Sequence, residues 1–289
     1  MNRRTFLQAN GSIWAGFVLT GAVPAVARTL SSSEWRSFEV VTSVELLQPK
    51  GEGRIWLPAA LTRDTPYQRT LSNRFSADGG VVRQTGDKQN AFGIVSAAFP
   101  AGTKPRLTLA SRVLLRNYSV DLSSRTTAPP VSRAELSYFL QPSRYVPTDG
   151  IVRETAAKVT AGATSDVDKV RAIFEWIIDN TFRDPKVRGC CRGDIRFTLE
   201  SGDLGGKCAD LNALYVGLAR SVGLPARHVY GLRIAKSEFG YKSLGLATDN
   251  ATKGQHCRAE VFLREHGWVP VDPAEVRKVV LEEPPAIGH

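Results

Sequence analysis

The sequence has little methionine, cysteine or histidine, and it carries no internal repeat. It holds one Met, four Cys and four His among 289 residues. No fixed period of the kind that marks solenoids, propellers or collagen is visible. The cysteines form no C-x-x-C pair, which is the spacing typical of a structural zinc site. After residue 27, no apolar run approaches the roughly 20 residues that cross a bilayer. These absences exclude repeat, fibrous and polytopic membrane proteins.

The composition that remains is that of a globular, basic protein. Hydrophobic residues make up 42%, and 38 Lys and Arg outnumber 28 Asp and Glu, giving a net charge of +10. Such a chain can bury a core and is not a disordered tail. The basic residues are scattered, without interleaved aromatics, so no nucleic-acid partner is expected. A positive surface instead favours anionic cell-envelope components as partners, over a range of about 8–10 Å at ordinary salt.

The first 27 residues have the pattern of an export signal. Arg3 and Arg4 precede Phe6, an apolar stretch without acidic residues runs over 13–26, and a small-x-small site ends at Ala27. The paired arginines predict a twin-arginine signal peptide over residues 1–27, and therefore a periplasmic or secreted protein. The alternative is an uncleaved anchor, and the chain is expected at a membrane only in that case.

The next segment is predicted to be all-β. Short runs of strand-forming residues are separated by turn signals such as Asp78-Gly79-Gly80, and they cover 38–46, 54–58, 68–75, 81–84, 92–99, 106–110 and 113–119. This spacing predicts an antiparallel β-sandwich domain over residues 31–125. The Pro- and Ser-containing stretch 126–147 is predicted to be an irregular linker.

Helical periodicity begins in the last segment, residues 148–289. A helix is expected over 151–161, and a second one is expected after Ser165, a good N-cap whose successors form one apolar face. Strands that precede helices in this way predict an α+β protein with two domains.

Cys208 is the first candidate for chemistry. It follows Gly205 and Gly206 and begins an apolar helical pattern that stops at Gly223. In the first turn of a helix, free N–H groups and the helix dipole lower a thiol pKa and favour a nucleophilic thiolate. The two glycines lack a Cβ and would let a substrate backbone approach. The alternative is a small cysteine that is simply buried in the core.

His256 and Asp272 are the second candidates. Residues 255–263 alternate in polarity, and a turn separates them from 268–272, so the two runs predict a β-hairpin. A Cys on a helix, a His on a strand and an Asp that orients the His make a catalytic triad. If Leu263 opposes Trp268, His256 lies three residues, about 10 Å, from the position opposite Asp272. A bulge, strong twist or a wider turn is then needed to join them.

Three sequence blocks resemble the transglutaminase-like superfamily, whose core is shared with papain-like thiol enzymes. They are Gly206-Lys207-Cys208-Ala209-Asp210 with Arg220 to Arg227, then His256, then Gly267 to Pro273. The resemblance implies a papain-like core with a helix-borne Cys and an antiparallel sheet over roughly 150–280. It implies that Cys208 is the nucleophile, His256 the general base and acid, and Asp272 the orienting carboxylate. The preceding β segment is similar to the N-terminal domain of some bacterial members.

The activity implied is thiol-dependent acyl transfer on amide bonds of peptides or proteins in the cell envelope, without a metal or other cofactor. The acyl-thioester can be resolved by water or by an amine, and the triad does not choose between them. Gly206, Lys207 and Gln255 are candidates for the oxyanion hole or cleft. The alternative is a catalytically inactive member of this family that binds or scaffolds envelope partners.

The other cysteines and histidines allow several roles. In an oxidising compartment Cys257 is a candidate to form a disulfide with Cys190 or Cys191, and the rival is a zinc site of these three cysteines with His256. The sequence does not decide whether the disulfide forms. Two further histidines are not candidates for the base: His228 is expected to be packed and His266 to be solvated. Arg227 is a candidate partner for a core carboxylate.

Overall fold

The computed structural model describes residues 34–87, 92–124, 130–189, 192–237, 240–246 and 248–283. The predicted signal peptide and the pair Cys190 and Cys191 lie outside these residues. The chain divides into two compact units between Tyr118 and Ser119. Within the described ranges, no helix combines the length and hydrophobicity that a membrane span needs.

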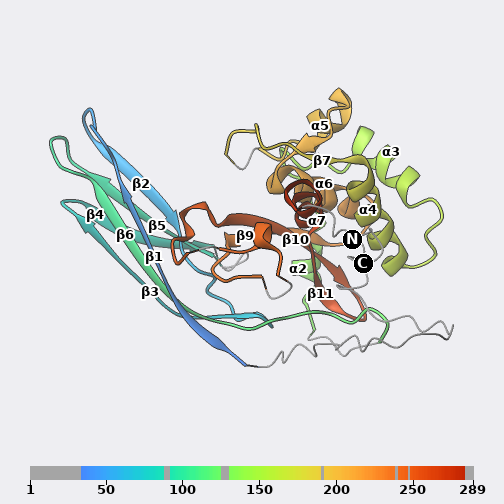
Figure 1. The fold of residues 1–289 in the computed structure, drawn as a ribbon, viewed down its shortest axis with the longest axis horizontal. Coiled ribbons are helices and arrows are strands. Elements are labelled where there is room, and N and C mark those ends of the chain that lie inside the picture. Colours follow the sequence, from blue (N-terminus) through green and yellow to red (C-terminus); the bar gives the residue numbers. More distant parts are fainter. Residues whose placement is uncertain are drawn as a thin grey trace. The chain divides into compact units, whose positions relative to one another are not determined.

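The first unit is an antiparallel β-sandwich of two three-stranded sheets, ordered β1-β6-β3 and β2-β5-β4 (Figure 1). Its strands are β1 (Arg36–Glu45), β2 (Gly53–Pro58), β3 (Gln68–Asp78), β4 (Val81–Asp87), β5 (Phe92–Phe99) and β6 (Arg106–Leu115). Alternation places one face of each sheet in a shared core. In β2, for example, Ile55 and Leu57 are buried while Trp56 is exposed.

The second unit is built on a three-stranded antiparallel sheet, ordered β11-β10-β9. Its main elements are α2 (Arg133–Tyr138), α3 (Gly150–Val159), α4 (Asp166–Asn180), β7 (Phe182–Arg183), α5 (Ile195–Ser201), β8 (Gly205–Gly206), α6 (Cys208–Ser221), β9 (Ala226–Leu232), β10 (Gln255–Leu263), β11 (Gly267–Val271) and α7 (Pro273–Glu282). Short 3₁₀ turns, η1 (Lys242–Leu244) and η2 (Ala251–Lys253), lie between β9 and β10.

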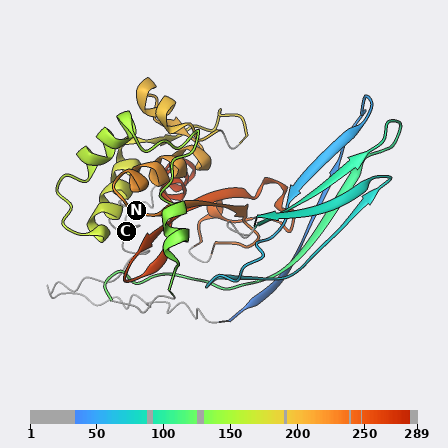
Figure 2. The same ribbon diagram turned by 180° about the vertical axis from the view of Figure 1, so that it is seen from behind.

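Helix α6 is the centre of this unit because it is apolar on nearly every side. Residues from Cys208 to Ala219 are all buried. The helix packs over β10, and α3, α4, α5 and α7 gather around it (Figure 1). Helix α2, drawn in green, lies beside the red strands of this sheet (Figure 2). The ring of Phe139, the residue after α2, meets that of Trp268 edge-to-face with centroids 5.2 Å apart. The sheet end that carries His256 is thus positioned by a fully buried helix.

The structure confirms the α+β class, with the antiparallel sandwich followed by a mixed helix and sheet core. It also confirms Ser165 as the N-cap of α4, where its hydroxyl and the Asp168 carboxylate form a capping box. The run predicted at 106–110 and the first residues of the run predicted at 113–119 belong to one strand, β6, which ends at Leu115. Segment 126–147, predicted to be an irregular linker, contains α2, whose N-cap is Ser132.

Candidate active site

Cys208 is the first residue of α6 and is 7% exposed. The turn before it is fixed by the buried carboxylate of Asp210, which accepts hydrogen bonds from the backbone N–H of Lys207 at 2.9 Å and of Gly193 at 3.2 Å. The first backbone N–H groups of a helix have no carbonyl partner within it. The sulfur of Cys208 therefore lies at the positive end of the helix dipole, where a thiolate is stabilised.

The two glycines before Cys208 are required by packing inside the protein. A Cβ on Gly205 would lie 2.4 Å from the ring of Phe182, and one on Gly206 would lie 2.6 Å from the Cβ of Asp210. The expectation that these glycines leave open space for a substrate is therefore wrong. Gly206 is buried, and its carbonyl accepts a hydrogen bond from the backbone N–H of Asp184 at 3.0 Å.

His256 and Asp272 meet because the hairpin turn is tighter than predicted. Leu263 pairs with Gly267, and Ala259 with Val271, so the register differs by one residue from the expected one. The next position, Asp272, falls level with Arg258 and becomes a diagonal neighbour of His256 on the same side of the sheet. His256 Nε2 donates a hydrogen bond to Asp272 Oδ2 at 2.5 Å. No bulge is needed to bring the two side chains together.

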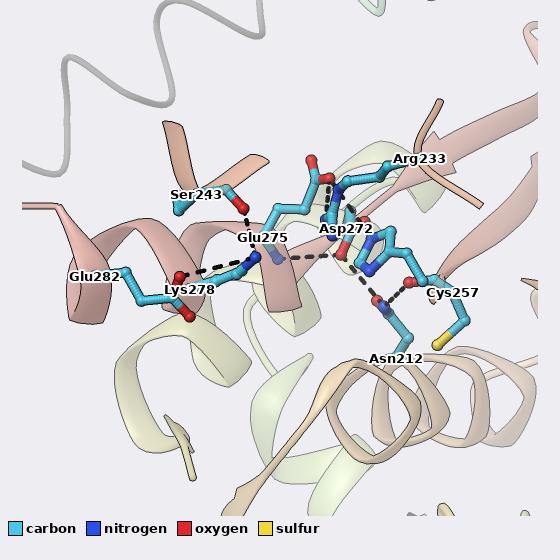
Figure 3. A network of polar contacts seen from close by, with 9 residues as sticks. Asn212, Arg233, Ser243, Cys257, Asp272, Glu275, Lys278 and Glu282 are labelled. Atoms are coloured by element: carbon cyan, nitrogen blue, oxygen red, sulfur yellow. Dashed lines mark hydrogen bonds and ion pairs between the residues drawn. The ribbon is translucent and has the colours of Figure 1, made fainter. Parts of the chain in front are cut away.

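Asp272 holds three partners at once. Its Oδ1 accepts hydrogen bonds from Asn212 Nδ2 at 3.2 Å and from the backbone N–H of Glu275 at 3.1 Å, while Oδ2 faces His256 (Figure 3). Asp272 is thereby the N-cap of α7, with Pro273 at the first helical position. Asn212 is fully buried one turn after Cys208, and its amide also donates to the carbonyl of Cys257 at 2.8 Å.

A second carboxylate lies beside the imidazole. Glu275 Oε1 is 3.5 Å from His256 Nε2 and 2.5 Å from the guanidinium of Arg233 (Figure 3). One ligand atom from each of His256, Asp272 and Glu275 lies within 4.8 Å of the others, as a metal site requires. Arg233 already neutralises Glu275, and the imidazole is already bonded to Asp272. The cluster is therefore arranged to hold a proton on His256.

The loop between β9 and β10 is tied to α7 through the same region. Arg233 binds Glu275, the backbone N–H of Ser243 donates to Glu283 at 2.8 Å, and Lys278 donates to the carbonyl of Ser243. A hollow of about 400 Å³ opens within this loop, lined by residues such as Ile234 and Leu246, and the three predicted catalytic residues do not line it.

The protonation states complement one another. Hydrogen bonds from Cys257 and His256 lower the pKa of Cys208 against the opposing effect of burial. Burial alone would lower the pKa of His256, but the hydrogen bond and charge of Asp272, together with the contact with Cys208, raise this pKa to about 9. Contact with Cys208 and burial raise the pKa of Cys257. These shifts favour ionisation of Cys208, protonation of His256 and a neutral Cys257 thiol.

The remaining predicted residues fall in different places. Lys207 is the N-cap of α6, and Gln255 is an exposed residue at the start of β10. His228 is packed as expected: its ring lies 5.4 Å from that of Tyr230, and burial lowers its pKa to about 4. His266 is 7% exposed, so the prediction that it is solvated is wrong.

Arg227 confirms the prediction of a core ion pair. Its Nη2 lies 2.8 Å from Glu260 Oε2, and Glu260 is 1% exposed. The same guanidinium lies 3.9 Å from the ring centroid of Trp268.

Cys257 is a free thiol that is 2% exposed. Its described neighbour is Cys208, whereas the predicted partners Cys190 and Cys191 lie outside the described residues. His256 is engaged with Asp272, which disfavours the zinc alternative that required this imidazole.

Sequence reasoning missed Asn212, Arg233 and Glu275. Two signals were available. Asn212 is four residues after Cys208, on the same face of the helix. Asp272 precedes a proline, and Asp followed by Pro is a common start of a helix, so α7 and its Glu275 were predictable.

Comparison with known proteins identifies one family. The sequence model of the Transglutaminase-like superfamily matches residues 153–273. An uncharacterized protein of Haemophilus influenzae is 31% identical over 266 residues, which covers 85% of this chain and 71% of the relative. The uncharacterized protein YebA of Bacillus subtilis is 27% identical over 131 residues, covering 43% of this chain and 17% of the relative.

A solved structure has the same fold. A Cytophaga hutchinsonii protein described as a proposed cysteine protease is similar with a TM-score of 0.64 and 18% sequence identity, covering 85% of this chain and 78% of that one.

Proposed function

Because the chain belongs to the transglutaminase-like superfamily, we propose that it is a thiol-dependent acyl-transfer enzyme that acts on amide bonds of peptides or proteins. Cys208 is the nucleophile, His256 the general acid and base, and Asp272 the residue that orients the imidazole. The observation that carries the proposal is the chain of contacts from sulfur to imidazole to carboxylate, with the 2.5 Å bond between His256 Nε2 and Asp272 Oδ2.

The first half of the reaction forms a thioester. The Cys208 thiolate attacks the amide carbonyl carbon and a C–S bond forms. His256, protonated at neutral pH, donates its proton to the nitrogen of the leaving amine, and the C–N bond breaks. Since Nε2 of His256 is bonded to Asp272, Nδ1 is the nitrogen that serves the sulfur and the substrate. Asp272 keeps its charge and fixes the ring.

The oxyanion is stabilised at the N-terminus of α6. The backbone N–H of Cys208 is one donor, because the first N–H groups of a helix have no carbonyl partner within that helix. The backbone N–H of Lys207 is not a second donor, since it is donated to Asp210.

The second half resolves the thioester with neutral His256 as the base. Thioester formation removes the negative charge from the Cys208 sulfur, and loss of this contact lowers the pKa of His256. The imidazole can then accept a proton from water, which gives hydrolysis, or from an amine, which gives transamidation. We propose that hydrolysis is the outcome when no added amine competes with water for the thioester.

We place this activity in the cell envelope, in the periplasm or as a secreted enzyme. The support is the pattern of Arg3 and Arg4 before an apolar, acid-free stretch that ends in a small-x-small site. The net charge of +10 favours substrates on anionic envelope components. Replacing both arginines with lysine should hold the full-length precursor in the cytoplasmic fraction. Unchanged export of that variant contradicts the twin-arginine route.

The test of activity is capture of the acyl-enzyme. The protein is incubated with a peptide library, with and without a labelled primary amine, and is analysed by intact mass and peptide mapping. A thioester on Cys208, followed by hydrolysed or amine-labelled peptides, is the expected result. Cys208→Ala should abolish both, while Cys190→Ala, which removes a cysteine outside the proposed triad, should keep both.

Rapid alkylation gives a second readout that needs no substrate. Because the pKa of Cys208 is lowered, iodoacetamide should label it at mildly acidic pH much faster than it labels glutathione. Slow labelling of Cys208 and the absence of any acyl-enzyme would together indicate the inactive, scaffolding alternative.

A further inference from the structure

A second thiol lies against the proposed nucleophile, and the acyl-transfer steps do not use it. Cys257 directly follows His256 on β10 and is 2% exposed. Cys257 and Cys208 belong to the same buried core cluster, and each thiol shifts the pKa of the other. A buried cysteine is often only a small apolar residue. Contact with a nucleophilic sulfur gives this one a further chemical role.

A hydrogen bond between the two elements that carry the thiols holds them close to each other. Asn212, one turn after Cys208 on α6, donates to the carbonyl of Cys257 at 2.8 Å. Figure 3 shows the sulfur of Cys257 directed toward the helix that carries Asn212. On its other side, Cys257 is paired with Tyr230 in the sheet. The helix start and the strand are therefore fixed against each other at the level of these two sulfurs.

Their ionisation states suit a stepwise reaction between them. Cys208 is a thiolate because its contacts with Cys257 and His256 lower its pKa, and Cys257 stays protonated because the neighbouring thiolate raises its pKa. A low-pKa thiolate reacts with peroxides, and a thiol placed beside it can resolve the product.

We propose that Cys208 and Cys257 form a reversible disulfide when a hydroperoxide enters the site, and that this bond shields the nucleophile from irreversible oxidation. The regulatory consequence, a pause in acyl transfer, rests on the proposed function, whereas the formation of the bond does not.

The chemistry balances in two steps. The Cys208 thiolate attacks one peroxide oxygen and the O–O bond breaks, giving a sulfenic acid, while the second oxygen leaves as hydroxide and takes the proton of His256. Cys257 then attacks the Cys208 sulfur, so that the S–S bond forms, the S–O bond breaks, and the hydroxyl leaves as water with the thiol proton. Two thiols are oxidised to one disulfide, and one hydrogen peroxide is reduced to two waters.

Among the described residues, Cys257 is the thiol placed to resolve the sulfenic acid, and its removal takes that thiol away. Further peroxide would then oxidise the sulfenic acid to the sulfinic acid, which thiol reductants do not reverse. The difference between a reversible and an irreversible product is therefore the signature of this arrangement.

The experiment treats the reduced full-length protein with hydrogen peroxide and maps its peptides without reduction. We expect a peptide pair linked through Cys208 and Cys257, loss of iodoacetamide labelling at Cys208, and recovery of that labelling with dithiothreitol. The Cys190→Ser, Cys191→Ser double variant is the matched control and should behave in the same way. A link from Cys257 to either of those cysteines, or no link at all, overturns the proposal.

The Cys257→Ser variant should accumulate sulfinic acid at Cys208, and dithiothreitol should not restore its labelling. Full recovery in this variant contradicts the proposal. Should this variant not fold, phenylarsine oxide provides the test on the unmutated protein, because trivalent arsenic bridges two adjacent thiols. We expect one bound arsenical to block iodoacetamide labelling of both Cys208 and Cys257. An adduct that leaves either thiol open to iodoacetamide overturns the inference.

Mass mapping and turnover separate the two proposals. A disulfide in a protein that never forms an acyl-enzyme refutes the proposed function alone. If peroxide abolishes peptide turnover, no disulfide forms and dithiothreitol does not restore the turnover, this inference alone is refuted.

Discussion

Replacing Asp272 with Asn would isolate the charge that this residue places on His256. An Asn at this position caps a helix about as well as Asp. Its side-chain oxygen can still accept the hydrogen bonds from the Glu275 backbone at 3.1 Å and from Asn212 at 3.2 Å. The start of α7 should therefore persist. What disappears is the negative oxygen that His256 Nε2 contacts at 2.5 Å.

The expected effect follows from the pKa of His256. Burial lowers it, and Asp272, by hydrogen bond and by charge, is the main cause that raises it from 6.5 to about 9. That difference corresponds to about 3 kcal/mol of preference for the imidazolium in the folded protein. In Asp272→Asn the pKa of His256 should fall back toward 6.5, so that the imidazole is largely neutral above neutral pH.

The same shift fixes how stability depends on pH. A histidine whose pKa is raised on folding contributes stability below its unfolded pKa, 6.5, and this contribution is lost as the pH rises through about 9. Asp272→Asn should therefore lower the free energy of unfolding by up to about 3 kcal/mol in mildly acidic solution. Above pH 9 the contribution of His256 to the free energy of unfolding should be the same in the variant and the parent.

The direct assay is an NMR titration of the imidazole rings. The chain has only four histidines, so their signals can be assigned by substitution. His228, whose pKa is lowered to about 4 by burial, provides an internal control that should not move in the variant. The reasoning is refuted if His256 titrates near 6.5 in the parent, or if it still titrates near 9 in Asp272→Asn.

Two further predictions use the ion pairs of the same unit. Arg233→Met should raise the pKa of His256 further, because the positive charge of Arg233 lowers it. Adding Glu275→Gln to that variant should reverse the rise. The same NMR titration measures both pKa values, and an unchanged pKa of His256 contradicts the coupling. Arg227→Met removes the guanidinium that lies 2.8 Å from Glu260, which is 1% exposed, while Arg258 stays 3.4 Å from the same carboxylate. It should cost up to about 3 kcal/mol by urea unfolding, and a loss below about 1 kcal/mol, the scale of a surface pair, contradicts the view that Arg227 is the main partner of this buried charge.

The strongest local patterns in the sequence were sufficient to predict much of this structure. The apolar periodicity after Gly206 predicted that a helix begins at Cys208, and the alternation after Gln255 predicted the strand that carries His256. The hairpin register failed by one residue. The loop is three residues long, 264–266, and the glycine that follows it, Gly267, adopts a left-handed φ of 72° and sets this shorter register. The predicted turn included Gly267. Treating it as the first residue of the second strand would have paired it with Leu263.

The contacts that could not be predicted are those made between elements distant in the chain. Nothing in the local pattern indicates that Asn212 reaches Asp272, 60 residues away, or that Arg233 reaches Glu275, 42 residues away. Such contacts depend on how α6 and α7 pack on the sheet, and this packing is fixed by the whole core. The position of Cys257 against Cys208 has the same origin, and composition alone favoured a different partner for it.

Asp272 links the formation of the fold to the assembly of the site. The carboxylate that orients His256 also begins α7 and accepts the amide proton of Asn212, which lies on the helix of the nucleophile. An unpaired buried amide costs roughly 1–3 kcal/mol, and a lost N-cap costs about 1 kcal/mol. Loss of the whole side chain thus removes the cap and takes one of the two acceptors away from the Asn212 amide, which keeps the carbonyl of Cys257, besides removing the charge. Asp272→Ala should therefore be less stable than Asp272→Asn at every pH, even though both lack the charge. The carboxylate therefore cannot leave its place beside the imidazole without α7 also losing its N-cap.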